Sequence, residues 1–422
     1  MAWKMSMRKP IRLQSLRPDR QLYFEGQLQL ILLVLEAYPF SGYSAVLVHM
    51  QICIDIQPAV TQRAGVGRYT RLLVEHLDTL AQEDELRLFS FDFKGRGAPI
   101  PTTHAEHRPL RWCPGRIAQQ LWKTLNWPPF EVFAGRADIY HFPNFLLPPL
   151  RGGKSVVTIH DMSFLRHPEF AESRNLRHLG SRIADTARRA DAIITDSRFS
   201  ADEICELLEV TPDRVNAIHL GISPGFSPPS DEATQRMRQA LSLDRPYLLS
   251  VGTVEPRKNL GFLVDVFEQM TEFDGMLVLA GMLGWKYEPI LERIAASSRA
   301  SDIRVLEYVD DGMLQALYGS AELLLITSHY EGFGFPPLEA MACGTPVLSS
   351  RGGSLPEVLG DAAPCIETDD AQRWSTEAMS LVNDGERRGE QVARGREHVK
   401  QYTWEQTASS TWDVYRRLAG AT

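Results

Sequence analysis

Two glutamates eight positions apart, Glu331 and Glu339, are the residues of this sequence whose type and spacing point most directly to chemistry. They lie in the segment H-Y-E-G-F-G-F-P-P-L-E-A-M-A-C-G, residues 329–344, which follows an apolar run over 323–327 that predicts a strand. Carboxylates accept paired hydrogen bonds from hydroxyl groups, which suits a ribose or another sugar. In the alternative interpretation Glu339 only complements a helix dipole and Glu331 is an exposed loop charge.

The residues around this pair predict a loop followed by a helix. Gly332 and Gly334 suit positions where the backbone turns or approaches a ligand, and the two prolines that follow suit the start of a helix. This places Glu331 on the loop and Glu339 in the first helical turn. Both carboxylates can then face one pocket at the carboxyl end of a parallel strand, where open α/β sheets bind ligands.

A second segment, G-T-V-E-P-R-K-N-L over 252–260, places two cations after another predicted strand. The strand ends in the turn at Gly252, and Arg257 and Lys258 lie at the start of the following helix. A cation at a helix N-terminus meets an unfavourable dipole that costs about 0.3–1 kcal/mol. A bound phosphate would remove this conflict, because helix N-termini, Arg and Lys all select anions. A solvated pair of loop charges is the alternative.

Two further segments place polar or glycine residues at strand ends. His160 closes a predicted strand over 155–160 and could hydrogen-bond a substrate hydroxyl or pass a proton, unless it is a structural histidine. The adjacent Asp161 points to the opposite face of an extended chain, so these two do not form a dyad. Gly65 and Gly67 open the first helix, but the third glycine of a dinucleotide fingerprint is missing, and NAD binding is not supported. A flexible glycine turn near a phosphate or an acceptor and a simple tight turn both stay open.

Several other chemistries lose support because their motifs are absent. The sequence contains no H-E-x-x-H, P-loop, D-x-D or G-x-S-x-G pattern, which argues against a metalloprotease, an NTPase and an α/β-hydrolase. The polar residues at 140–145 and at 195–197, which include Asp196, are expected to be structural.

The elements that position these residues alternate between strands and helices. Short apolar runs predict two series of strands, at 51–56, 86–92, 137–141, 155–160 and 192–195, and at 247–251, 276–280, 303–308, 323–327 and 346–349. The segments 66–80, 173–190 and 201–209, the last with a cap at Ser197, predict helices. Such alternation predicts parallel sheets with helices on both faces.

A cluster of Pro, Gly and Ser over 221–230 separates the two series and predicts a linker. We therefore expect an N-terminal domain over 51–225 and a C-terminal domain over 226–400, with a ligand cleft between them. The last part of the chain, 401–422, has apolar residues on one helical face from 404 to 418 and predicts a helix that needs a surface to cover.

Composition supports an ordinary globular protein. Of 422 residues 44% are hydrophobic, and the net charge of -8 gives no electrostatic footprint for nucleic acid. Five Cys without a C-x-x-C pair argue against a disulfide framework and a zinc site and favour a cytoplasmic location.

The first 49 residues differ from the rest in charge. They carry six basic and three acidic side chains, so the remainder has a net charge of -11. Three interpretations stay open for 1–50: an extension outside the fold, a membrane-surface anchor, or a membrane span. Met50, immediately before the first predicted strand, is a candidate for the true start of the protein.

Taken together, the motifs around Glu331 and Glu339 and at 252–260 resemble those of the retaining, nucleotide-sugar-dependent glycosyltransferases of family 4, from about residue 51 to the C-terminus. The resemblance implies the GT-B fold: two Rossmann-like α/β domains with parallel sheets, an interdomain cleft, and a terminal helix that packs back on the N-terminal domain.

The resemblance also implies roles for individual residues. Arg257 and Lys258 would bind the donor diphosphate, Glu331 the hydroxyls of the donor sugar, and Glu339 the ribose. His160 would contact the transferring sugar. The other implied substrate-binding residues are Gly65, Gly67, Gly252, Gly332, Phe333, Gly334 and Phe335.

Within the family, the segments Y-H-F-P-N-F, T-I-H-D and T-D-S-R-F-S resemble those of bacterial enzymes that transfer mannose or rhamnose from GDP-sugars in O-antigen or exopolysaccharide synthesis. The implied partners are a nucleotide-sugar donor and a saccharide or lipid-linked saccharide acceptor, with no cofactor or metal because Arg and Lys take the place of a divalent cation. We expect a cytoplasmic enzyme, with contact to the inner face of the plasma membrane left open, and no nucleic-acid partner. A sugar-nucleotide isomerase, a phosphorylase and a non-catalytic sugar-nucleotide-binding protein are the alternatives, and the oligomeric state is not predicted.

Overall fold

The computed structural model describes residues 49–420 except 63–64, 96, 98–99, 172–179 and 308. The interpretations of residues 1–48, and most of the first half of the helix expected at 173–190, lie outside the described residues. Residues His49–Thr422 group together as one compact unit.

Seven parallel strands form the first sheet, in the order β3-β2-β1-β4-β5-β6-β7. Their bounds are β1 (Gln51–Asp55), β2 (Glu85–Phe91), β3 (Glu106–Leu110), β4 (Ile139–Phe142), β5 (Lys154–Thr158), β6 (Ala192–Thr195) and β7 (Val215–Ala217). All carboxyl ends therefore lie at one edge of this sheet.

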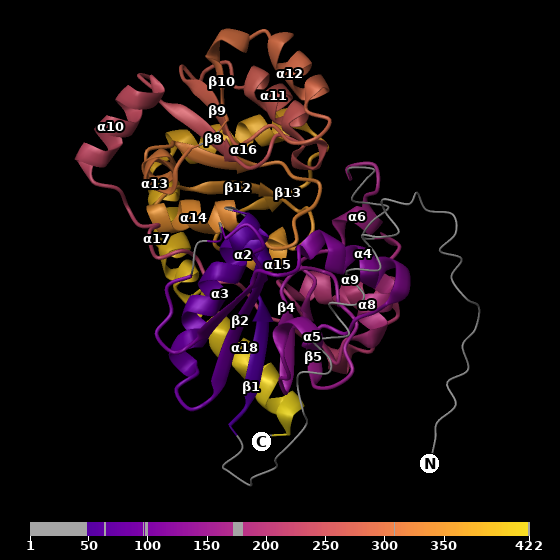
Figure 1. Ribbon diagram of the computed structural model, residues 1–422. Coiled ribbons are helices and arrows are strands. Elements are labelled where there is room, and N and C mark those ends of the chain that lie inside the picture. The colour runs from indigo at the N-terminus through magenta and orange to yellow at the C-terminus, as the bar shows by residue number, and fades with distance from the viewer. Residues whose placement is uncertain are drawn as a thin grey trace, which may run out of the picture. The chain divides into compact units, whose positions relative to one another are not determined.

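Six parallel strands form the second sheet, in the order β10-β9-β8-β11-β12-β13, shown with the first in Figure 1. Their bounds are β8 (Tyr247–Val251), β9 (Met276–Ala280), β10 (Ile303–Leu306), β11 (Leu323–Ile326), β12 (Val347–Ser350) and β13 (Cys365–Ile366). Two parallel α/β sheets are the architecture expected of the GT-B fold.

Helices connect the strands. In the first half of the chain they are α2 (Gln57–Thr61), α3 (Val66–Leu80), α4 (Gly115–Leu125), α5 (Glu131–Ala134), α6 (Ser163–Arg166), α8 (Ile183–Arg189), α9 (Arg198–Leu208) and the 3-10 turn η2 (Pro212–Arg214). In the second half they are α10 (Asp231–Leu241), η3 (Pro256–Lys258), α11 (Leu260–Gln269), α12 (Glu288–Ala295), η4 (Ala300–Asp302), α13 (Asp311–Gly319), α14 (Phe335–Cys343), α15 (Leu355–Leu359), α16 (Ala371–Asn383), α17 (Gly385–His398), η5 (Val399–Gln401) and α18 (Trp404–Ala419). None of the described helices is long and apolar enough to cross a bilayer.

Both faces of each sheet are buried. In β1, Ile52 and Ile54 belong to one apolar cluster and Cys53 to another. In β8 the neighbouring residues Leu249 and Leu248 divide in the same way between two clusters. Successive side chains of a strand point to opposite faces, so a strand covered by helices on both sides must be apolar throughout, and such runs made these strands visible in the sequence.

The ten predicted strands are confirmed to within a few residues, but three strands were missed. β3 reads E-H-R-P-L and is mostly exposed, and as the edge strand it tolerates a proline. β7 and β13 have only three and two residues. None of the three contains the continuous apolar run on which the prediction relied.

The last helix, α18, runs along α3 beside the first sheet (Figure 1). The start of α18 packs closely against the backbone at Gly221. A Cβ on Gly221 would lie 2.2 Å from the backbone nitrogen of Trp404. The hydroxyl of Tyr415 lies 2.6 Å from Nδ1 of His141, a buried histidine of β4. Burial lowers the pKa of His141 to about 3, so its imidazole is neutral and needs a hydrogen-bond partner for each nitrogen.

We expect Tyr415→Phe to lower the free energy of unfolding by about 1–3 kcal/mol, because it leaves a buried nitrogen of His141 without a partner. Urea titration followed by circular dichroism measures this. Arg416→Ala, an exposed change on the same helix, should stay within about 0.5 kcal/mol of the parent. Equal stability of the two variants would contradict a stabilising hydrogen bond between Tyr415 and His141.

Candidate active site

The loop between β11 and α14 carries Glu331 and lies against the first sheet. Gly334 precedes α14 with a φ of 104°, a left-handed conformation that favours glycine. A Cβ on Gly332 would lie 2.6 Å from the Cβ of Asp161. The carbonyl of Gly332 accepts a hydrogen bond of 2.8 Å from the hydroxyl of Ser197. The glycines thus allow this loop to approach the strand ends of the first sheet.

Two cations hold the carboxylate of Glu331. Nη1 of Arg257 donates to its Oε2 at 2.8 Å, and Nζ of Lys258 donates to its Oε1 at 2.6 Å. The hydroxyl of Ser328 donates to the same Oε1 at 2.6 Å. Arg257 also donates through Nε to the buried carboxylate of Glu255 at 3.0 Å. Two positive and two negative charges therefore balance at the carboxyl ends of β8 and β11.

The turn after β8 sets the position of Lys258. Gly252 has a φ of 145°, and a Cβ on it would lie 2.9 Å from Cε of Lys258. Both cations end the 3-10 turn η3 and do not lie in the first turn of α11, because Asn259 breaks the helix with a φ of 53°. The two cations therefore precede α11, and the carboxylates of Glu255 and Glu331 balance their charge.

The charges of this cluster are coupled. Burial alone would raise the pKa of Glu331, but the neighbouring Lys258 and Arg257 outweigh it and hold that pKa at about 2. Burial lowers the pKa of Lys258 against the opposing attraction of Glu331. Glu331 is consequently ionised at any physiological pH.

Glu339 has different partners. Nη1 of Arg68 donates to its Oε1 at 3.0 Å, and the hydroxyl of Tyr318 donates to its Oε2 at 2.9 Å. Arg68 belongs to α3, so this ion pair joins the two sheet domains. The prediction that Glu339 lies in the first helical turn was wrong: α14 already begins at Phe335, before the prolines, which makes Glu339 its fifth residue.

His160 lies two residues after β5 and is paired with Asp196, which follows β6. Nδ1 of His160 is 2.9 Å from Oδ2 of Asp196, and Nε2 is 3.2 Å from the carbonyl oxygen of Pro143. Both partners accept hydrogen bonds, and only the protonated imidazolium donates from both nitrogens. Burial opposes this protonation, but Asp196 outweighs burial and raises the pKa of His160. Asp161 instead accepts a hydrogen bond from the backbone of Ser163 at 2.9 Å, as expected for a residue outside the dyad.

The remaining predicted residues are placed mainly by packing. A Cβ on Gly67 would lie 2.0 Å from the carbonyl oxygen of Gln62, so this glycine permits close packing. Gly65 precedes α3 with a φ of 56°, and a Cβ there would contact nothing. Phe333 is buried with its ring centroid 5.3 Å from that of Phe335.

Sequence reasoning missed three residues that contact the site: Arg68, Asp196 and Tyr330. Arg68 was passed over within the G-V-G-R segment, and Asp196 was interpreted as structural. Tyr330, next to Glu331, donates its hydroxyl to Glu203 of α9. The usable signal for Asp196 was its position at a parallel strand end, directly before a helix cap. Among the described residues no group of three or more His, Cys, Asp or Glu is placed to hold a metal ion.

Comparison with known proteins agrees with the motifs. A family model described as Glycosyltransferase Family 4 matches residues 63–226, and one described as Glycosyl transferases group 1 matches residues 231–398. The O-antigen chain mannosyltransferase B of Escherichia coli is 31% identical over 390 residues, which are 87% of this chain and 100% of that protein.

Solved structures show the same fold. Sucrose-phosphate synthase from Thermosynechococcus elongatus matches with a TM-score of 0.70 and 20% identity, over 89% of this chain and 100% of that one. Anabaena HepE in complex with UDP-glucose matches with a TM-score of 0.63 and 16% identity, over 87% of this chain and 100% of that one. The chain therefore belongs to the family 4 glycosyltransferases and is a glycosyltransferase with the GT-B fold.

Proposed function

We propose that this glycosyltransferase transfers mannose or rhamnose from a GDP-sugar to a saccharide or lipid-linked saccharide, with retention at the anomeric carbon and without a metal ion. The acceptor would be a growing cell-surface polysaccharide such as O-antigen. The observation that carries the proposal is the buried cluster in which Arg257 and Lys258 flank Glu331. The name of the Escherichia coli relative, an O-antigen chain mannosyltransferase, supports the choice of sugar and acceptor.

The cations suit the departure of a nucleoside diphosphate. Lys258 uses one donor on Glu331, so its ammonium group has further N–H donors for a phosphate oxygen. Charge that develops on a leaving group is stabilised best by donors already oriented in a site shielded from water. Arg257 is oriented by Glu255 as well as by Glu331, which limits its motion before the donor arrives.

Glu331 is suited to bind the donor sugar. Its carboxylate stays ionised and could accept hydrogen bonds from donor hydroxyls while it stabilises the positive charge of an oxocarbenium-like centre. Both of its oxygens already accept hydrogen bonds, so we do not assign it the role of covalent nucleophile. We propose that Glu339 accepts hydrogen bonds from the ribose hydroxyls of the donor. These hydroxyls would join or replace Arg68 and Tyr318 as its hydrogen-bond partners.

His160 suits a donor role. Because Asp196 and Pro143 occupy its nitrogens as acceptors, His160 has no lone pair with which to deprotonate an acceptor hydroxyl. A sugar oxygen that replaces the carbonyl of Pro143 would receive the proton of Nε2 in a hydrogen bond. The base is then the leaving diphosphate, which lies on the face that retention requires.

Donor entry needs movement. The cavity beside Lys258, Gly252 and Ser328 has a volume of about 10 Å³, which holds no more than one water molecule. We expect the two domains to open for the donor and to close before transfer.

Lys258→Ala should lower the transfer rate by about 100–1000-fold, because it removes one oriented donor from the leaving diphosphate. The rate is measured with GDP-mannose and a saccharide acceptor, with product analysis to separate transfer from turnover of the donor alone. Arg351→Ala, which removes an exposed cation after β12, is the control and should be near the parent rate. A transfer rate of Lys258→Ala equal to that of the parent would contradict the proposal.

The pH dependence should report on His160. The pKa of His160 is raised above its ordinary value of 6.5, so its imidazole stays protonated to a higher pH. Activity should fall as the pH rises through that pKa. Asp196→Asn removes the charge that raises the pKa, so the fall should begin at lower pH. Rates between about pH 5 and 9 show this. Asp191→Asn, at the amino end of β6, should leave the profile unchanged, and the same profile in both variants would argue against the dyad.

GDP-mannose at about 100 times its dissociation constant should stabilise the protein by about 2.7 kcal/mol, as measured by thermal unfolding. UDP- and ADP-sugars at the same concentration should stabilise it less, and EDTA should change neither the shift nor the transfer rate. A larger shift with UDP-glucose would contradict the proposed base, and loss of activity in EDTA would contradict metal independence.

A further inference from the structure

A hollow of about 550 Å³ lies at the outer edge of the second sheet, beside the edge strand β13. Helices α15, α16 and α17 and the loop before β13 supply its walls. Its volume is in the range of sites that hold a small organic ligand. We call it the β13 hollow, and its lining includes Arg351, Asp361, Leu381, Arg387, Gln391 and Arg394.

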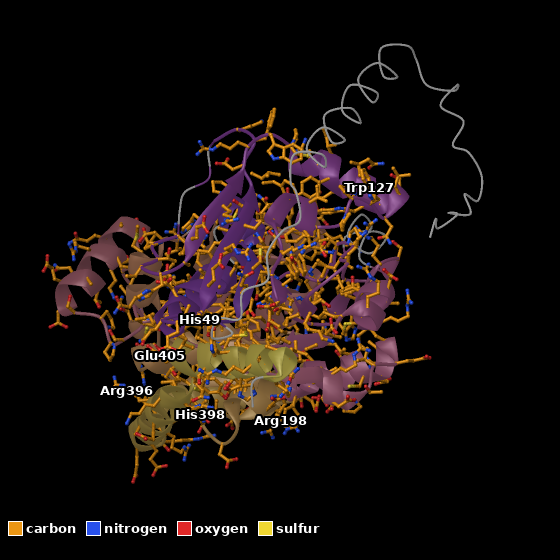
Figure 2. The ribbon with its side chains drawn as sticks, turned by 60° about the horizontal axis from the view of Figure 1, so that its bottom comes forward. His49, Trp127, Arg198, Arg396, His398 and Glu405 are labelled. Carbon is orange, nitrogen blue, oxygen red and sulfur yellow. The ribbon has the colours of Figure 1, made fainter. Side chains whose placement is uncertain are left out.

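One face of α17 forms a wall of the β13 hollow. Arg387, Gln391 and Arg394 follow one another at spacings of four and three positions, which place side chains on one side of a helix. The end of the same helix, where Figure 2 labels His398, packs against α15. There Nε2 of His398 donates to the carbonyl oxygen of Val358 at 2.8 Å. The wall is therefore held in place by the fold itself.

Gln391 brings an unsatisfied hydrogen-bond acceptor to this wall. The residue is 2% exposed, and its Nε2 donates to the carbonyl oxygen of Val347 at 2.6 Å. Its Oε1 is buried and has no hydrogen-bond partner among the described residues. Buried polar atoms without a partner are rare in native proteins, because they have lost their hydrogen bonds to water. A ligand hydroxyl that reaches this oxygen would supply the missing donor.

Two charged side chains of the β13 hollow are also without partners. Arg394 and Asp361 are exposed, and neither makes a hydrogen bond or an ion pair with another residue in the described part of the chain. A guanidinium and a carboxylate thus line one hollow without pairing with each other. Both are available to a ligand.

The other two arginines differ in how firmly they are held. Nη1 of Arg387 donates to the hydroxyl of Ser380 at 2.7 Å, and its Nη2 donates to the carboxylate of Glu377. Arg351 forms an ion pair of 3.3 Å with Glu367 in which both side chains are more than half exposed. Such exposed pairs contribute little in water. Arg351 is therefore a second cation that an anion could recruit.

The groups that line the β13 hollow match a sugar phosphate. Guanidinium groups bind phosphate oxygens in pairs, and carboxylate and amide oxygens accept hydrogen bonds from hydroxyls. The apolar side chains of Leu381 and Pro364 can cover the C–H face of a sugar ring. None of the described lining residues is aromatic, so a nucleobase would find no ring on which to stack.

The β13 hollow is separate from the candidate active site. The cluster around Glu331 lies at the carboxyl ends of β8 and β11, and β12 lies between β11 and β13. No residue lines both the hollow and the cavity beside Lys258. A ligand in the hollow would therefore leave the donor site open.

We propose that the β13 hollow is a second ligand site, which binds a hexose phosphate. Arg394 and Arg351 hold the phosphate group, while Asp361 and Gln391 accept hydrogen bonds from the hydroxyls of the sugar. The inference does not depend on the donor or on the acceptor of the transferase.

The experiment is isothermal titration calorimetry of the full-length protein with four probes: mannose 1-phosphate, mannose 6-phosphate, glucose 1-phosphate and glucose 6-phosphate. At least one should bind at least about 10-fold more tightly than inorganic phosphate and than the free hexose, because each part alone leaves some of the polar groups unpaired. Lys258→Ala should bind this probe like the parent, because the donor site is elsewhere.

Arg394→Gln should weaken binding of the hexose phosphate by at least about 10-fold, because it removes a charged donor to the phosphate. Asp361→Asn should lower the preference for hexose phosphate over inorganic phosphate, because it weakens an acceptor for the hydroxyls. The matched controls are Arg373→Gln on α16 and Asp369→Asn in the loop before it, two exposed residues that do not line the hollow. Both controls should bind like the parent, and all four variants should keep the parent transfer rate without a sugar phosphate.

Three results would overturn the proposal. The first is that none of the four probes binds, or that inorganic phosphate binds as tightly as they do. The second is equal binding by Arg394→Gln and Arg373→Gln. The third is loss of binding in Lys258→Ala with parent-like binding in Arg394→Gln, which would place the ligand in the candidate active site.

Discussion

The carboxylate of Glu331 held between Arg257 and Lys258 is the interaction on which the rest of the site depends. A charge that is almost excluded from water is costly unless partners surround it, and removal of one partner leaves the others uncompensated. Here each oxygen of Glu331 has a cation, and Glu255 completes the balance on the far side of Arg257. For these short contacts to form, the backbone turns that carry Glu331 and the two cations must lie close together.

Glycines satisfy that requirement in the turns around the cluster. Gly252 leaves room for Lys258 after β8, and a Cβ on Gly353 would lie 2.3 Å from the carbonyl oxygen of Glu331. The same carbonyl accepts a hydrogen bond from the backbone of Ser354 at 2.9 Å. The loop is therefore fixed by β8 on one side and by the turn after β12 on the other, and an ionised carboxylate of fixed position can act on a sugar without first being reoriented.

The contacts between the two sheet domains include several polar ones beside aromatic contacts such as Phe199 with Tyr330. Glu357 of α15 accepts hydrogen bonds from the first backbone nitrogens of α9 and from His219, and Arg68 reaches Glu339. Polar contacts of this kind break at lower cost than an apolar core, which is consistent with the domain opening that we propose for donor entry.

Local pattern determined which segments are strands or helices, the cap at Ser197 and the loop at Glu331, because each depends on residues close by in the chain. The family followed from several such motifs taken together. Local pattern did not find β3, which is polar and mostly exposed, and it placed Glu339 in the first turn of α14, of which Glu339 is the fifth residue. Only the tertiary structure decided the partners. His160 meets Asp196 because β5 and β6 are adjacent in the sheet, and Arg68 meets Glu339 across 271 positions because the two domains dock. Such pairings follow from the order of strands and the fit of surfaces, which no short stretch of sequence contains.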